Sequence, residues 1–171
     1  RRQRQMCIRD RICEMDYEEM SIKELTQRAQ INRKTFYLHY DSLDDLLREI
    51  QNDLAQDFIR RTEGMAPPRD MDKITREFFL SQESLGKLGE RITCAGSYQY
   101  VSRRITSDIM SQTWTKGPGD PFRQDIIMTF ISQSTLAIYK QWVADGKRIP
   151  LEDIIELAIR LVCHGVEGIK L

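Results

Sequence analysis

Apolar residues recur along this chain at the three- and four-residue spacing of an α-helix, and no segment shows the alternation of a β-strand. In one long stretch, Leu43, Leu47 and Ile50 begin a stripe that continues to Phe58. The pattern predicts an all-α protein of about nine helices. They are expected at about 3–16, 21–29, 32–40, 42–64, 71–81, 83–93, 97–115, 122–145 and 151–169.

Two breaks interrupt the helical pattern. The adjacent prolines of MAPPRD, residues 65–70, end the long helix because proline has no backbone N–H to donate, and GPGDP at 117–121 forms the second break. We therefore expect two domains: a three-helix domain over 1–48 and a helical domain over 49–171, joined by the long fourth helix.

Residues 21–40 indicate two short helices separated by a tight turn. Ser21 is expected to cap the first helix, with its hydroxyl accepting a backbone N–H while the Glu24 side chain returns to the Ser21 amide. In the second helix, Phe36 is expected to turn inward together with either Leu38 or Tyr40. The two helices would share one core.

The exposed side of that second helix would carry Arg33, Lys34, Thr35, Tyr37 and His39. A helix that reads DNA needs such donors and rings near its N-terminus, because short side chains there reach the base edges in a major groove about 12 Å wide. The pattern is typical of a helix-turn-helix DNA-binding domain. The alternative is two short helices of an ordinary all-helical domain, with the same groups merely exposed.

The run INRKTFYLHYDSLDDLL resembles the signature of the TetR family of one-component transcriptional regulators. The Thr-Phe-Tyr triplet, the following His-Tyr and the capped helix with a Leu-Leu pair carry this resemblance. It implies that Lys34, Thr35 and Tyr37 face bases or nearby phosphates, and that His39 and Tyr40 flank the DNA backbone. The full expected DNA-contact set is Arg2, Arg4, Ser21, Lys23, Arg33, Lys34, Thr35, Tyr37, His39 and Tyr40.

Two positions depart from the family's pattern. Gln30 occupies the place in the turn where the family usually has glycine, so a left-handed backbone there would cost about 1 kcal/mol. Leu43 replaces the lysine that usually holds a phosphate at the start of the fourth helix. Either the free N–H groups of this helix end still attract a phosphate, or Leu43 packs into the core with Leu47.

Charge and composition narrow the function further. The net charge is zero, but residues 1–40 hold nine Lys/Arg against six Asp/Glu, a net +3, and residues 41–66 hold three against seven, a net −4. This places the phosphate-facing surface at the N-terminal end. No apolar run is long enough to cross a membrane and no signal peptide follows the basic start, so we expect a cytoplasmic protein.

The sequence offers no support for an enzyme. The four cysteines lack paired spacing and there are two histidines, so we expect reduced thiols and neither a metal site nor a cofactor. No nucleophile has a nearby base and no glycine-rich phosphate loop occurs, so we assign no catalytic residue.

The last two helices carry a wider apolar surface than one internal contact requires. TFISQSTLAIYKQWVADGK resembles the C-terminal region of one TetR subgroup, and the family's organisation implies a four-helix interface between two subunits. A fully intramolecular core is the alternative. The expected interface residues are Ile127, Phe130, Ile131, Ser134, Ile138, Trp142, Ile155, Ala158, Leu161, Val162 and Gly165.

The resemblance implies a homodimeric regulator, in the first instance a repressor, that binds an inverted-repeat operator in duplex DNA and is released by a small-molecule or protein effector. Aromatic and methionine residues of the second domain are candidates for an effector pocket, with plain core as the competing interpretation: Phe78, Phe79, Tyr98, Tyr100, Met110 and Trp114. The alternative function is a co-regulator or interaction module with the same fold and weak or lost DNA binding.

Overall fold

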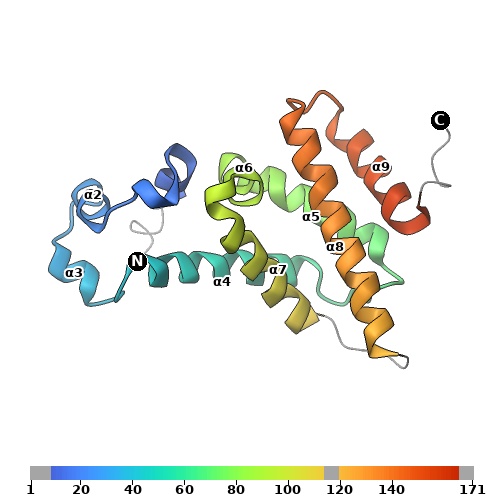
Figure 1. The fold of residues 1–171 in the computed structure, drawn as a ribbon, viewed down its shortest axis with the longest axis horizontal. Helices are drawn as coiled ribbons and strands as arrows, with labels where there is room; N and C mark the ends of the chain where they lie inside the picture. Colours follow the sequence, from blue (N-terminus) through green and yellow to red (C-terminus); the bar gives the residue numbers. More distant parts are fainter. Residues whose placement is uncertain (1–8, 114–119, 166–171) are drawn as a thin grey trace. The chain divides into compact units, whose positions relative to one another are not determined.

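The computed structural model describes residues 9–113 and 120–165 of the 171-residue chain, and within these ranges it contains helices and no strand (Figure 1). This confirms the predicted all-α class. A first helix covers 9–14. The later elements are η1 (Tyr17–Glu19), α2 (Ile22–Arg28), α3 (Arg33–Tyr37), α4 (Leu43–Arg61), α5 (Met71–Leu85), α6 (Lys87–Cys94), η2 (Gly96–Tyr98), α7 (Gln99–Thr113), α8 (Pro121–Ala144) and α9 (Leu151–His164).

Three predicted helix boundaries differ clearly from the structure: α9 ends at His164 and not at 169, α6 begins at Lys87 and not at 83, and α5 ends later than predicted. The sequence pattern ended a helix near residue 81, whereas α5 continues to Leu85 and the chain turns at Gly86, whose φ is 55°. The Ser81 hydroxyl donates to the Phe78 carbonyl (2.7 Å) and the Ser84 hydroxyl donates to the Ser81 carbonyl (3.0 Å). These serines are satisfied within the helix, so they do not end it, and glycine supplies the left-handed conformation that does.

The chain forms two compact units, and each is described separately. Unit 1 comprises the chain up to Gln56 together with Leu85–Asp108, and unit 2 comprises Asp57–Ser84 together with the chain from Ile109. Residues 85–108, which the sequence interpretation assigned to the second domain, thus pack with the N-terminal helices. The functional division at residue 48 stays a prediction.

Unit 1 has one continuous core. Residues of the first helix, α2, α3 and α4 pack with residues of α6, η2 and α7. Its buried side chains are Ile12, Met20, Leu25, Phe36, Tyr40, Leu46, Leu47, Ile50, Leu88, Ile92, Tyr98 and Val101. Removing this surface from water contributes about 25 cal/mol per Å² of apolar area, which holds the short helices α2 and α3 in place although neither is long enough to be stable alone.

Polar contacts fasten α6 and η2 to the end of the first helix. The Arg91 guanidinium donates to the Ile12 carbonyl (3.1 Å) and to the Asp16 carboxylate (2.8 Å). The Ser97 hydroxyl also donates to Asp16 (2.7 Å), and the Tyr98 hydroxyl donates to the Met15 carbonyl (2.9 Å). The hydrogen bonds from Ser97 and Arg91 hold the pKa of Asp16 below its ordinary value. The segment after α5 is therefore built into the unit that contains α2 and α3.

Unit 2 is organised around aromatic packing between α5 and α8. Phe78, Phe79, Tyr139 and Trp142 form a cluster whose ring centroids lie 5.5–6.2 Å apart, mostly edge to face. A second cluster joins Met71 of α5 to α8 and α9. The buried residues of α9 are Ile154, Ile155, Ala158 and Val162.

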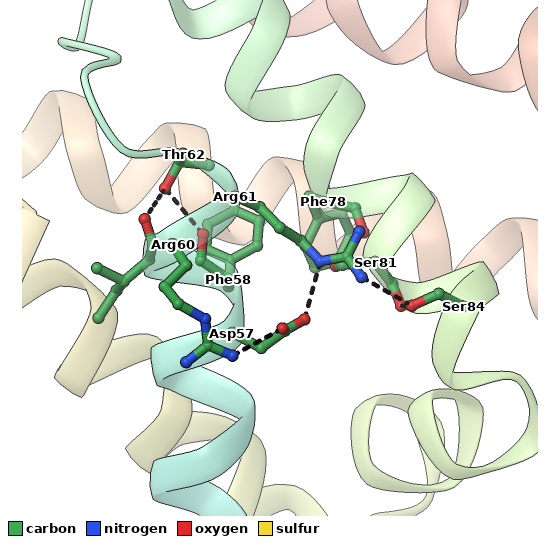
Figure 2. A network of polar contacts seen from close by, with 9 residues as sticks. Asp57, Phe58, Arg60, Arg61, Thr62, Phe78, Ser81 and Ser84 are labelled. Atoms are coloured by element: carbon green, nitrogen blue, oxygen red, sulfur yellow. Dashed lines mark hydrogen bonds and ion pairs between the residues drawn. The ribbon is translucent and has the colours of Figure 1, made fainter.

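The end of α4 is tied to α5 within unit 2 (Figure 2). Asp57 accepts from Arg60 (3.0 Å) and from Arg61 (2.8 Å), and Arg61 reaches Ser84 on α5 (3.4 Å). The arginine contacts, that of Arg61 first, lower the pKa of Asp57. α4 begins in unit 1 and ends in unit 2, so it is one of the helices through which the chain passes between the units, as are the end of α5 and α7.

Candidate nucleic-acid interface

The α2 helix begins at the predicted Ser21 cap but lacks the predicted contact from the Glu24 side chain, and it ends in a specific turn. The Ser21 hydroxyl accepts from the Glu24 N–H (3.3 Å), while the Glu24 carboxylate pairs with Arg11 instead of returning to the Ser21 amide. At the other end, Ile31 N–H donates to the Thr26 carbonyl (2.9 Å) and Gln30 N–H donates to the Gln27 carbonyl (3.2 Å). This pair of bonds is a Schellman motif, which requires a left-handed residue after the helix.

Gln30 is that residue, with a φ of 52°, so the left-handed backbone whose cost the sequence raised is present. We expect Gln30→Gly to raise the free energy of unfolding by up to about 1 kcal/mol, because glycine adopts this conformation without the clash of a Cβ but is freer in the unfolded chain. Chemical denaturation measures the difference. Gln30→Val is the matched control and should destabilise the protein; equal stability of the three proteins would contradict the assignment of strain.

The α3 helix has two clearly different faces. The Asn32 side chain caps it by accepting the Lys34 N–H (2.9 Å). Phe36 and Tyr40 are buried in the core of unit 1, whereas Leu38 is 77% exposed, which decides the alternative that the sequence left open. The Tyr40 hydroxyl donates to Glu49 on α4 (2.6 Å). Tyr40 therefore fixes α3 against α4, and we leave it out of the proposed DNA contacts.

Of the remaining residues expected to contact DNA, those that the structure describes lie at the surface of unit 1. Arg33, Lys34 and His39 are exposed, Tyr37 is 54% exposed and Thr35 is half-buried. Ser21 and Lys23 are exposed at the start of α2. Arg2 and Arg4 lie outside the described residues. The structure thus gathers cations and ring groups on α3 and at the N-terminal end of α2.

Two other basic side chains nearby form ion pairs within unit 1. Glu14 of the first helix accepts from Arg11 (2.8 Å) and from Arg28 at the end of α2 (2.6 Å). These two contacts, that of Arg28 first, hold the pKa of Glu14 at about 2. These ion pairs link the first helix to α2 and give both Arg11 and Arg28 a carboxylate partner within unit 1.

The start of α4 shows where the Leu43 side chain lies. The Ser42 hydroxyl accepts from the Asp45 N–H (3.2 Å), and the Asp45 carboxylate accepts from the Asp41 N–H (3.2 Å), so the first turn is capped. Leu43 is half-buried against the core of unit 1. The sequence-based alternative in which Leu43 packs into the core thus describes its position.

We expect Leu43→Lys to lower the free energy of unfolding by about 1 to 2 kcal/mol, because it removes apolar contact with the core. Parallel measurements of the melting temperature and of DNA affinity test this. Leu43→Met, which conserves volume and apolarity, is the control. If the Leu43→Lys variant melts at the same temperature and binds every DNA sequence more tightly, the result would instead favour a phosphate contact at this position.

The residues suggested for an effector pocket are distributed over both units. In unit 2, Phe78 and Phe79 belong to the aromatic cluster, and Met110 packs against the second cluster. In unit 1, Tyr98 is buried and Tyr100 packs edge to face on Tyr17, with ring centroids 5.9 Å apart. Trp114 lies outside the described residues. Tyr139, at the centre of the aromatic cluster, was absent from the predicted set, although its four-residue spacing from Thr135 and three-residue spacing from Trp142 placed it on the same face of α8.

The expected dimer residues divide into three groups by their burial. Ile127 and Phe130 are exposed, and Ser134, Ile138, Leu161 and Gly165 are half-buried. The other five are buried within unit 2 of the same chain, which corrects the surface on which an interface could lie: Ile131, Trp142, Ile155, Ala158 and Val162. Helical periodicity placed Ile127, Phe130, Ile131 and Trp142 on one face of α8, whereas the structure exposes the first two and buries the last two.

Chemical sites of other kinds are not evident in the described ranges. Over 9–113 and 120–165, no three His, Cys, Asp or Glu side chains come together in a way that could hold a metal ion. Across the same residues, none of the helices combines the length and apolarity needed to cross a bilayer.

Comparison with solved structures identifies the fold. The chain is similar to the TetR-like transcriptional regulator LfrR from Mycobacterium smegmatis in complex with proflavine, with a TM-score of 0.52 and 17% sequence identity over 99% of this chain and 96% of that chain. Another structure of LfrR matches with a TM-score of 0.42, 15% identity and coverage of 96% and 94%. No protein-family profile and no curated protein matches the sequence. The chain has the fold of a TetR-like transcriptional regulator.

Proposed function

We propose that this protein is a sequence-specific DNA-binding transcriptional regulator that acts in the cytoplasm as a repressor. The observation that carries the proposal is the exposed face of α3, where Lys34 and Tyr37 stand on a helix anchored from behind by Phe36 and Tyr40. Such a helix presents donors and a ring to the base edges of a major groove. The exposed Lys23 and Arg33, with Arg2 and Arg4, supply phosphate contacts that set its position.

The proposed active form is a homodimer, because two reading helices related by a two-fold axis recognise an inverted repeat. The α8 apolar face, defined as Phe122, Ile126, Ile127 and Phe130, supports this proposal because all four side chains are exposed in the monomer. At 100° per residue Phe122, Ile126 and Phe130 fall opposite the buried Met128, Ile131 and Thr135, and Ile127 lies between the two groups. A contiguous exposed apolar strip of this kind marks an association surface.

Release by an effector is the proposed mode of regulation. The LfrR structure contains proflavine, which makes a small molecule the first class of effector to examine for a protein of this fold. Phe78, Phe79 and Met110 of unit 2 remain candidates for its contacts. A signal there would reach the DNA-reading helices through α4, whose Arg61 is held by Asp57 of the same helix and donates to Ser84 on α5.

Selection of bound fragments from a pool of genomic duplex DNA tests the proposal directly. We expect recovery of fragments that share an inverted repeat with half-sites about one helical turn apart, and footprinting should show protection of both half-sites. Failure to enrich any sequence would overturn the regulator proposal. It would favour the alternative, a co-regulator or interaction module that keeps the fold; the departures at Gln30 and Leu43 are the features that support it.

A further inference from the structure

The exposed face of α3 carries an apolar group that polar readout of DNA does not use. Leu38 is 77% exposed and follows the last residue of α3, with its N–H donating to the Lys34 carbonyl (3.2 Å) and a backbone φ of −70° and ψ of −14°. Residues 34, 37 and 38 are therefore related by helical spacings of three and four and lie on one face. Leu38 shares this face with Lys34 and Tyr37.

A single exposed leucine is ordinary on a protein surface and would need no explanation alone. Here a second large side chain, Tyr37, is 54% exposed beside it, and the neighbouring Arg33 and Lys34 are exposed cations. Exposed cations around an apolar side chain suit a ligand that is negatively charged and also exposes apolar atoms, as duplex DNA does. In the DNA major groove, the apolar group at a base edge is the C5 methyl of thymine.

We infer that Leu38 is a specificity-determining residue that reads the C5 methyl of one thymine in each half-site. This inference rests on the proposed function and names what one position of the reading helix recognises. The leucine side chain has no donor or acceptor, so a cytosine amino group or a guanine edge placed against it would lose a hydrogen bond to water without replacement. Thymine alone offers it a methyl group.

The contact is expected to be worth about fourfold in affinity for each half-site, the change that corresponds to burying one methyl-sized group. Changing both half-sites should then reduce affinity about tenfold or more. Leu38→Ala is suited to a test because the side chain lies outside the core and its truncation leaves the Phe36 and Tyr40 packing intact.

The experiment uses the full chain and the duplex obtained by selection. Each thymine in a half-site is replaced in turn by deoxyuridine, which pairs identically but lacks the methyl group. With the wild-type protein, we expect one thymine position at which replacement in a single half-site weakens binding about fourfold. Leu38→Ala should bind the thymine duplex more weakly and show no further loss with deoxyuridine at that position, whereas Tyr37→Ala should retain the loss.

Two results would overturn the inference. One is binding that is indifferent to every deoxyuridine replacement, and the other is a loss that persists unchanged in Leu38→Ala. In both cases sequence-specific binding by the wild type would remain, so the proposed function would stand. Absence of any selected duplex would overturn the proposed function and this inference together.

Discussion

Affinity for duplex DNA is expected to fall by roughly 10³- to 10⁵-fold between 50 and 200 mM salt, which is the largest effect that follows from the proposed function. Each phosphate neutralised by a lysine or arginine releases counterions and contributes about −0.9 to the slope of log K against log salt. Exposed Lys23 and Arg33, with Arg2 and Arg4, would supply these charges in each subunit. Fluorescence anisotropy over a salt series measures the slope, and a flat dependence would contradict the proposal.

Variants in the same assay separate the two kinds of contact. Lys23→Ala should weaken binding to all sequences alike and make the slope shallower by about two for a dimer, because one phosphate contact is lost in each subunit. Tyr37→Ala removes no charge, so it should leave the slope unchanged and reduce the difference between selected and unrelated DNA. Arg148→Ala is the charge-matched control on an exposed residue of unit 2 and should change neither quantity. Identical behaviour of Lys23→Ala and Tyr37→Ala would show that their assigned roles are wrong.

The second large effect is dissociation of the dimer. A carboxylate introduced on the α8 apolar face and one introduced in the core of unit 2 should have different consequences. Phe130 is 57% exposed on the α8 apolar face, so Phe130→Glu should leave the monomer folded and place an unpaired charge at the subunit interface. We expect a monomer in sedimentation, an unchanged helical signal in circular dichroism and a loss of affinity for the inverted repeat.

Ala158→Asp addresses the interior of the same unit. Ala158 is completely buried within the chain, so a carboxylate there should destabilise the folded monomer by about 3 to 5 kcal/mol rather than dissociate an intact dimer. The control for Phe130→Glu is Ile149→Glu, which also replaces an exposed apolar residue by glutamate; Ile149 is 41% exposed and lies beyond the end of α8. It should remain dimeric. A dimer that survives Phe130→Glu would place the association surface elsewhere.

The local structure of the DNA-reading region could be predicted from the order of its residues. Ser21 caps α2 through its side-chain oxygen, Phe36 turns inward, and Gln30 takes the left-handed conformation that ends α2. These features depend on residues within a few positions of one another, where the propensities of individual side chains and the helical period suffice to predict the outcome.

Which apolar residues are covered, and by what, depended instead on packing between distant parts of the chain. The sequence allowed either Leu38 or Tyr40 to turn inward with Phe36. In the structure Tyr40 is the buried residue, and its hydroxyl donates to Glu49 on α4. Similarly, α8 is apolar on two faces, and packing against α5 and α9 buries the face of Ile131 while leaving the face of Phe130 exposed. Residues 85–108 join unit 1 through Arg91 and Tyr98, which meet the first helix more than 70 residues away. Helical periodicity describes the faces of one helix, whereas burial depends on partners that are distant in the sequence. The pattern therefore could not predict which apolar faces are buried or which unit residues 85–108 join.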